Sequence, residues 1–157
     1  MNEIVLNIEK YSLTFAAAHF LPGFGKCDRL HGHNYRLRVE AKGKLGENHA
    51  LIDFTLLKKK LLEIIEPLDH KILIASRSDV IEIKDDKMEK NVEIKAGSKN
   101  YSFPRKDIIY LPLIATTCEQ LSIYIHNEVK KVFPTFKILV EIEETPGSSA
   151  KHSDMDF

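Results

Sequence analysis

Residues 31–42, HGHNYRLRVEAK, decide the fold of this chain. From Tyr35 onward the odd positions are apolar, whereas the even positions are polar or charged. Because successive side chains of a strand point to opposite faces, this alternation predicts a half-buried antiparallel β-strand. His31 and His33 fall on its apolar side, two residues apart, so they project from the same face.

The preceding run continues the pattern on a neighbouring strand. Its odd positions, from Tyr11 to His19, share one face, so His19 can join His31 and His33 on the covered side of a sheet. Imidazole nitrogens are common zinc ligands, and three histidines with an open fourth position are typical of a catalytic zinc site. Cys27 lies between them, and two alternatives follow for it. The thiol would either close the site as the fourth ligand of a structural zinc or remain a reactive group.

The chain has 157 residues, a formal net charge of zero and two cysteines. Its length predicts a single domain, residues 1–157, with a core of its own. The balanced charge argues against a general nucleic-acid or membrane-surface binder, and no apolar run reaches membrane-spanning length. Two cysteines without an export signal are typical of reduced cytoplasmic thiols. We therefore expect a cytoplasmic protein with neither a nucleic-acid nor a membrane partner.

Helices are marked by their caps. Asp53 is a suitable N-cap for a helix within residues 51–66, where apolar residues recur at helical spacing. Thr116 and Thr117 each begin a capping box for a second helix, which Pro134 ends.

The other segments predict strands and an insert. Residues 4–18 are strand-like with a bend near Lys10, and residues 136–145 alternate as a last strand. Residues 76–113 change in character and predict an extra hairpin-like insert. The tail, residues 148–157, has no assignment.

Glu144 is placed on an apolar face if the alternation of the last strand continues. An ionised carboxylate in that position is costly unless a partner pairs with it. A bound heterocycle with adjacent N–H donors would supply a two-pronged hydrogen bond. The alternative is that the strand ends at Glu143 and that Glu144 is simply solvated.

Two further positions carry possible chemistry. Asp69 precedes His70 in a loop, where the carboxylate can orient the imidazole as a proton carrier, although a plain surface histidine is the alternative. Cys118 begins the second helix, whose N-terminus would lower the pKa of the thiol. The alternative for Cys118 is an ordinary, inert first-turn residue, which we favour.

Short motifs follow one another in a fixed order along the chain. They are Phe15-Ala-Ala-Ala-His19, Cys27-x-x-x-His31-Gly-His33, Ile52-Asp53-Phe54, Leu68-Asp69-His70, Thr117-Cys118-Glu119 and Glu144-Thr145. In this order they resemble the 6-pyruvoyltetrahydropterin synthase superfamily. The gap between Cys27 and His31 is most similar to the 6-carboxytetrahydropterin synthase branch. The pyruvoyl-forming branch usually has a wider gap, and the folate branch typically replaces the cysteine with a nearby glutamate.

The resemblance implies a tunnelling fold, an α+β architecture in which a four-stranded antiparallel sheet carries two helices on one face. Residues 76–113 would add the hairpin-like insert. Members assemble through their sheet edges as trimers that stack into hexamers, with active sites at subunit interfaces. We therefore expect a homo-oligomer.

The resemblance also implies roles. The zinc ion (Zn2+) would be held by His19, His31 and His33, and a Cys27 thiolate would abstract a proton. Asp69 and His70, from a neighbouring subunit, would form the partner proton relay. The pterin ring would be anchored by Glu144, with help from Thr117, Cys118 and Glu119.

The reaction implied for this branch converts 7,8-dihydroneopterin triphosphate to 6-carboxytetrahydropterin, acetaldehyde and triphosphate, towards 7-deazaguanine bases of tRNA. Pyruvoyl formation and aldol cleavage to a hydroxymethylpterin are alternatives, because both use the same zinc, base and pterin anchor. A closed structural zinc site in a non-catalytic module is the alternative from another class of protein.

Overall fold

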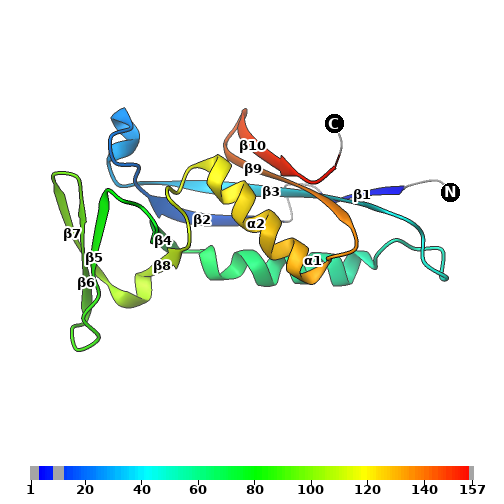
Figure 1. The fold of residues 1–157 in the computed structure, drawn as a ribbon, viewed down its shortest axis with the longest axis horizontal. Helices are drawn as coiled ribbons and strands as arrows, with labels where there is room; N and C mark the ends of the chain where they lie inside the picture. The colour runs from blue at the N-terminus through cyan, green and yellow to red at the C-terminus, as the bar shows by residue number, and fades with distance from the viewer. Residues whose placement is uncertain (1–3, 9–12, 156–157) are drawn as a thin grey trace.

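The computed structural model describes residues 4–8 and 13–155 of the chain (Figure 1). The bend expected near Lys10, and Tyr11, lie outside the described residues. The strands are β1 (Ile4–Ile8), β2 (Thr14–His19), β3 (His31–Gly43), β4 (Lys71–Ala75), β5 (Ile81–Lys84), β6 (Asn91–Ala96), β7 (Lys99–Pro104), β8 (Ile108–Leu111), β9 (Lys137–Thr145) and β10 (Ser148–Ser153). The helices are α1 (Phe54–Ile65) and α2 (Cys118–Val132), with short 3-10 turns η2 (Gly25–Asp28), η3 (Glu66–Leu68) and η4 (Arg105–Asp107).

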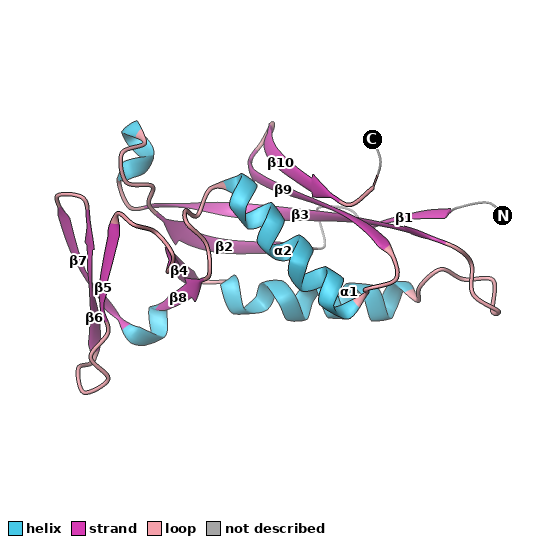
Figure 2. Cartoon of the chain, in the orientation of Figure 1, coloured by secondary structure: helices cyan, strands magenta, loops and turns pink. Residues whose placement is uncertain are grey.

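The long strand β3 organises the main sheet. It pairs antiparallel with β1, β2 and β9, and β10 pairs antiparallel with β9. Tyr35, Leu37, Val39 and Ala41 are fully buried while the residues between them are not, which confirms the predicted alternation. Both α1 and α2 contribute to the core that covers this face (Figure 2). The predicted α+β class, with both helices on one face of the sheet, is therefore confirmed, and the antiparallel pairing holds for β1, β2, β3, β9 and β10.

The main sheet is larger than the four strands expected. Over residues 4–8 and 13–155 it has seven strands, in the order β10-β9-β3-β2-β4-β8, with β1 also paired to β3. Strand β4 joins β2 in parallel, and β8 joins β4 in parallel. The sequence of β4 shows no alternation because both faces are covered: Leu73 packs in the core beneath the helices, whereas Ile74 packs against the insert.

Strand β10 lies in the tail that had no assignment. Its sequence, SSAKHS, is polar and gives no apolar alternation, so propensity alone does not mark it. The strand is stabilised by pairing with the edge of β9, where Ser149 also donates a 2.8 Å hydrogen bond from Oγ to the Glu141 carboxylate. This cover leaves Glu141 only 5% exposed although it points away from the helices.

The insert is a small sheet rather than a plain hairpin. Among the described residues it has three strands in the order β5-β6-β7, and the predicted hairpin corresponds to β6 and β7. Its apolar side forms a second core around Val92 and Ile94, which packs on Phe20, Ile74 and Ile108 of the main body. Figure 1 shows the insert at the end of the molecule opposite to the loop that joins β3 to α1.

The helix caps agree with the sequence. The Asp53 carboxylate accepts hydrogen bonds from the backbone N–H groups of Thr55 and Leu56, at 2.6 and 3.0 Å, and so starts α1. At α2 the cap is Thr117, whose Oγ1 accepts from the N–H of Gln120. Neither helix is long and apolar enough to span a bilayer, judged over the described residues.

Candidate functional site

His19, His31 and His33 meet where β2 ends and β3 begins. The two strands are joined by the loop 20–30, and His19 pairs directly with His31 at the loop end of the ladder. Gly32 permits this close pairing, because a Cβ there would lie 3.1 Å from the carbonyl oxygen of Ala17. The sequence prediction that the three imidazoles share the covered face is confirmed.

The three imidazoles form a group that could hold a metal ion. Their ligand nitrogens all lie within 4.8 Å of one another, and this is the one such group in the part of the chain that the structure describes. His19 Nδ1 donates to the carbonyl oxygen of Thr116 at 2.9 Å, and His31 Nδ1 donates to that of Arg29 at 2.6 Å. Metal-binding histidines are typically oriented in this way, because a donated Nδ1–H leaves Nε2 available.

Burial favours the neutral form of His19 and His33. His19 is fully buried, and this desolvation lowers its pKa to about 4, although the hydrogen bond to Thr116 acts in the opposite direction. Burial also lowers the pKa of His33, while the charge of Glu144 raises it. Neutral imidazole is the form that coordinates a metal, so the residues present fit a metal site.

Glu144 faces this group from β9. Its Oε1 lies 3.4 Å from Nε2 of His19 and 3.4 Å from Nε2 of His33. Tyr35 donates from its hydroxyl to the same oxygen at 3.5 Å. Because β9 continues to Thr145, the alternative that the strand ends at Glu143 is wrong, and the carboxylate is turned toward the site.

Cys27 lies in the loop 20–30, on η2, with its side chain at the surface. It is not a member of the group of metal-ligand atoms found among residues 4–8 and 13–155. Cys27 is a free thiol in this structure. Since the loop connects His19 to His31, it holds Cys27 at the same end of the sheet as the imidazoles.

Asp69 and His70 are brought together as the sequence predicted. Asp69 Oδ2 accepts from His70 Nδ1 at 2.8 Å, and Oδ1 accepts from the N–H of Ala16 at 2.7 Å. The hydrogen bond from Ala16 is also the main reason why the pKa of Asp69 is lowered. His70 has φ of 57°, a left-handed conformation that is uncommon outside glycine. Its imidazole is 83% exposed, with Nε2 available for proton exchange.

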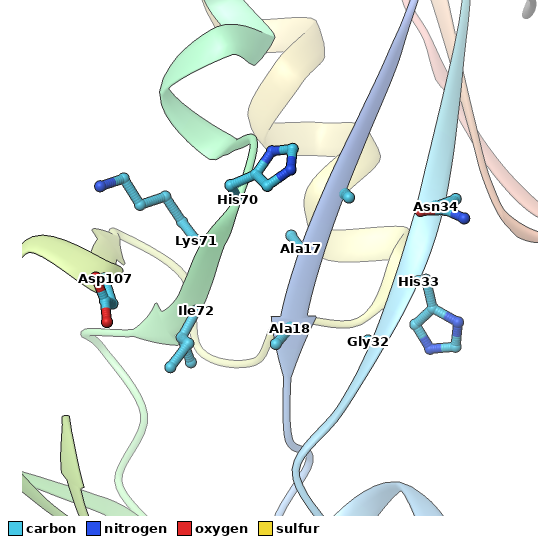
Figure 3. Close-up of a pocket in the computed structure, with 10 residues that line it drawn as sticks. Ala17, Ala18, Gly32, His33, Asn34, His70, Lys71, Ile72 and Asp107 are labelled. Carbon is cyan, nitrogen blue, oxygen red and sulfur yellow. The ribbon is translucent and has the colours of Figure 1, made fainter. Parts of the chain in front are cut away.

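The Asp69–His70 pair and the imidazole group lie on opposite sides of β2 within one chain. His33 pairs with Ala17 on one side of β2, and Lys71 pairs with Ala17 on the other. Two strand spacings, about 10 Å, therefore separate the backbones of His33 and Lys71. A groove of about 500 Å³ runs across β2 between His33 and His70, whose imidazoles lie to either side of the strand in Figure 3.

The start of α2 adjoins the imidazole group through Thr116, whose backbone and hydroxyl both contact His19 Nδ1. Thr117 caps the helix, and Glu119 is exposed in the first turn. Cys118 is half-buried and donates from Sγ to the carbonyl oxygen of Ile142 at 3.1 Å. Burial raises the pKa of this thiol to about 11, so the alternative of a lowered pKa is wrong and the inert interpretation holds.

Comparisons with known proteins agree with this geometry. The family profile described as 6-pyruvoyl tetrahydropterin synthase matches residues 8–154. The chain belongs to this family. It is similar to a Methanocaldococcus jannaschii protein provisionally named 6-carboxy-5,6,7,8-tetrahydropterin synthase, with 36% identity over 74% of this chain and 71% of that protein. It is also 30% identical to the Haemophilus influenzae 6-carboxy-5,6,7,8-tetrahydropterin synthase, over 90% of this chain and 94% of that protein.

Solved structures of the family share the fold. The crystal structure of the Plasmodium vivax 6-pyruvoyl tetrahydropterin synthase has a TM-score of 0.88 and 26% identity, covering 98% of both chains. This similarity confirms the tunnelling fold. Variants of the Plasmodium vivax protein have also been solved in which a glutamate, described as a catalytic residue, is replaced by alanine or cysteine.

Three residues of the site, Tyr35, Thr116 and Arg29, were not predicted from the sequence. Tyr35 was assigned only to the apolar face, yet its hydroxyl lies 3.4 Å from His19 Nε2 as well as against Glu144. The signal for it was present, because Tyr35 is the next member of the i, i+2 series that begins with His31 and His33. Thr116 and Arg29 act through their backbone carbonyls, and a carbonyl leaves no signature in the sequence.

Proposed function

We propose that this member of the 6-pyruvoyl tetrahydropterin synthase family is a zinc-dependent 6-carboxytetrahydropterin synthase. With uptake of one water, it would convert 7,8-dihydroneopterin triphosphate to 6-carboxytetrahydropterin, acetaldehyde and triphosphate. The observation that carries this proposal is an exposed Cys27 in the loop that joins two members of an open imidazole group. The names of the M. jannaschii and H. influenzae relatives support it. The product would serve the synthesis of 7-deazaguanine bases of tRNA, in the cytoplasm.

Zinc would be held by Nε2 of His19 and His31 together with His33. When bound there, it would act as a Lewis acid that polarises side-chain oxygens of the substrate and so acidifies the neighbouring carbon. The chain itself contributes the orientation of the ligands, through the carbonyl oxygens of Thr116 and Arg29.

Proton transfer would be divided between two groups. Cys27, as thiolate, would take the proton from the substrate carbon. His70 would return a proton elsewhere, because Asp69 binds Nδ1 and leaves Nε2 exposed toward solvent or substrate. The family resemblance implies that the Asp69–His70 pair of a neighbouring subunit has this role, and the separation of His70 from the imidazole group within one chain is consistent with it.

Glu144 would anchor the pterin ring by accepting hydrogen bonds from adjacent N–H groups. Thr117, Cys118 and Glu119 would complete this part of the pocket. The Glu144 carboxylate is partly buried, and it contacts the uncharged side chain of Tyr35 and the imidazoles of His19 and His33.

Replacing Glu144 with glutamine should weaken pterin binding by about 2–5 kcal/mol, because the variant loses one charged partner of a buried contact. Glu143→Gln is the matched control, since Glu143 points to the other face of β9 and pairs with Arg36. Calorimetry with a dihydropterin ligand measures both affinities. Equal affinity in Glu144→Gln and wild type would exclude Glu144 as the anchor.

We also propose a homo-oligomer, most simply a hexamer of stacked trimers. The main sheet is open, with β10 at one edge and β8 at the other. The backbone N–H and C=O groups of an edge strand can pair with a strand of another copy. Light scattering at micromolar concentration should detect a species well above the chain mass of 18.0 kDa. A monomer with full activity would contradict a site shared between subunits.

Identification of the product tests the proposed reaction. Zinc-loaded protein is incubated with 7,8-dihydroneopterin triphosphate, and the pterin product is identified by mass spectrometry while acetaldehyde is trapped. A 6-carboxy product is expected. A 6-pyruvoyl product would instead favour the second candidate, which the high structural similarity to the Plasmodium vivax 6-pyruvoyl tetrahydropterin synthase supports.

A further inference from the structure

The insert contacts the loop 20–30 at two separate points. The Lys99 ammonium donates to the backbone carbonyl of Asp28 at 2.7 Å and also pairs with the Asp28 carboxylate. At the other end of the loop, Tyr101 stacks on Phe20 with ring centroids 4.9 Å apart and an interplanar angle of 18°. Phe20 directly follows His19, and Asp28 directly follows Cys27, so the insert contacts both flanks of the loop.

Lys99 is well placed for this contact because it starts β7 immediately after the β6–β7 turn. Ala96 pairs with Lys99, and Gly97 has φ of 61°, a left-handed conformation that suits a tight hairpin turn. In Figure 1 this hairpin rises toward the blue helical turn η2 at the same end of the molecule. The Lys99 side chain is about one-third exposed, as is that of Asp28.

The loop is cross-linked internally, so a contact at Asp28 restrains its neighbours. Leu21 donates from its N–H to the carbonyl of Cys27 at 2.7 Å, and the N–H of Cys27 donates to Phe24 at 3.0 Å. On the other side of Asp28, the carbonyl of Arg29 accepts the hydrogen bond from His31 Nδ1. Asp28 therefore lies between Cys27, which bears the thiol, and Arg29, whose carbonyl oxygen orients the imidazole of His31.

We propose that Lys99 is a positioning residue for the reaction: it fixes the Asp28 peptide and thereby holds the Cys27 thiol in place relative to the imidazole group. The insert then acts as a brace, which means that it restrains the loop 20–30 that carries Cys27. This inference rests on the proposed function, because that function makes Cys27, in the loop 20–30, the residue that abstracts the proton. The hydrogen bond from Lys99 is also the main reason why the pKa of Asp28 is lowered.

Lys99→Ala tests the brace, with Lys95→Ala as the matched control. Lys95 lies in the same insert and forms an ion pair with Glu82 at 2.8 Å, so both variants lose one lysine and one ion pair. In Lys99→Ala, kcat should fall about 10-fold, since small misplacement of a reacting group is costly. KM should change by less than about 2-fold. Lys99→Arg should restore most of kcat, whereas Lys95→Ala should match the wild type in both constants and in thermal midpoint.

A second measurement does not depend on turnover. Amide hydrogen exchange of residues 21–29 and the rate of Cys27 alkylation by iodoacetamide should both rise in Lys99→Ala and stay unchanged in Lys95→Ala. Unchanged exchange and alkylation in Lys99→Ala would overturn the proposal that Lys99 restrains the loop. An equal loss of kcat in Lys99→Ala and Lys95→Ala would also overturn it. If the wild type turned over no dihydropterin, the proposed function would fail, while exchange and alkylation would still decide whether Lys99 restrains the loop.

Discussion

Cys27→Ala should bind 7,8-dihydroneopterin triphosphate and yet turn it over at least ~10²-fold more slowly, which is the usual scale for the loss of a positioned proton-transfer group. The physical reason is that the substitution removes the base without removing any member of the imidazole group. Single-turnover kinetics on zinc-loaded protein separates the chemical step from binding. Binding of the substrate, measured by calorimetry, should stay close to that of the wild type.

The zinc content of Cys27→Ala is the control for this experiment. It should equal that of the wild type, because the three histidines alone would hold the metal. A variant that loses its zinc together with its activity would favour a closed site in which the thiol is the fourth ligand, and the role of Cys27 as base would be wrong.

His31→Ala and His33→Ala should each lose most of the bound zinc, starting from about one zinc per chain in the wild type. Three neutral ligands are near the minimum for tight binding, so the removal of one is expected to have a large effect. Elemental analysis after dialysis against a weak chelator measures the metal retained. Turnover should fall in proportion to the metal that is lost.

His152→Ala is the matched control for the metal experiment. His152 is also partly buried, but its ring packs on His126, with ring centroids 4.6 Å apart, rather than on the site. This variant should keep its zinc, and circular dichroism should show that all three histidine variants remain folded. Retention of zinc by both His31→Ala and His33→Ala would exclude the imidazole group as the metal site.

The central strands and helices could be predicted because their sequence patterns are local. Alternation in residues 31–42 set the buried face of β3, and the caps Asp53 and Thr117 set the starts of α1 and α2. The same alternation placed His19, His31 and His33 on one face, since a period of two determines which side of a strand a residue occupies. Glu144 followed from the same rule applied to β9.

Other features depend on contacts between distant segments, which local patterns do not encode. Strand β10 is polar and exists because the edge of β9 was available for pairing. The parallel pairing of β4 with β2 and β8 is possible because the insert covers the second face of β4. The pKa of Cys118 could not be predicted for a similar reason: it depends on how deeply the fold buries the thiol, and here desolvation raises the pKa.

By itself the sequence determined the covered face of each central strand, and with it the set of imidazoles that could hold a metal, because side-chain direction follows from backbone periodicity alone. Tertiary structure decided how those imidazoles are oriented, through the carbonyl oxygens of Thr116 and Arg29, and which groups surround them. It also joined Lys99 to Asp28, 71 residues apart in the chain. These hydrogen-bond and ion-pair partners depend on the packing of the whole chain, because a carbonyl oxygen or a lysine has no preferred long-range partner until the fold places one within reach.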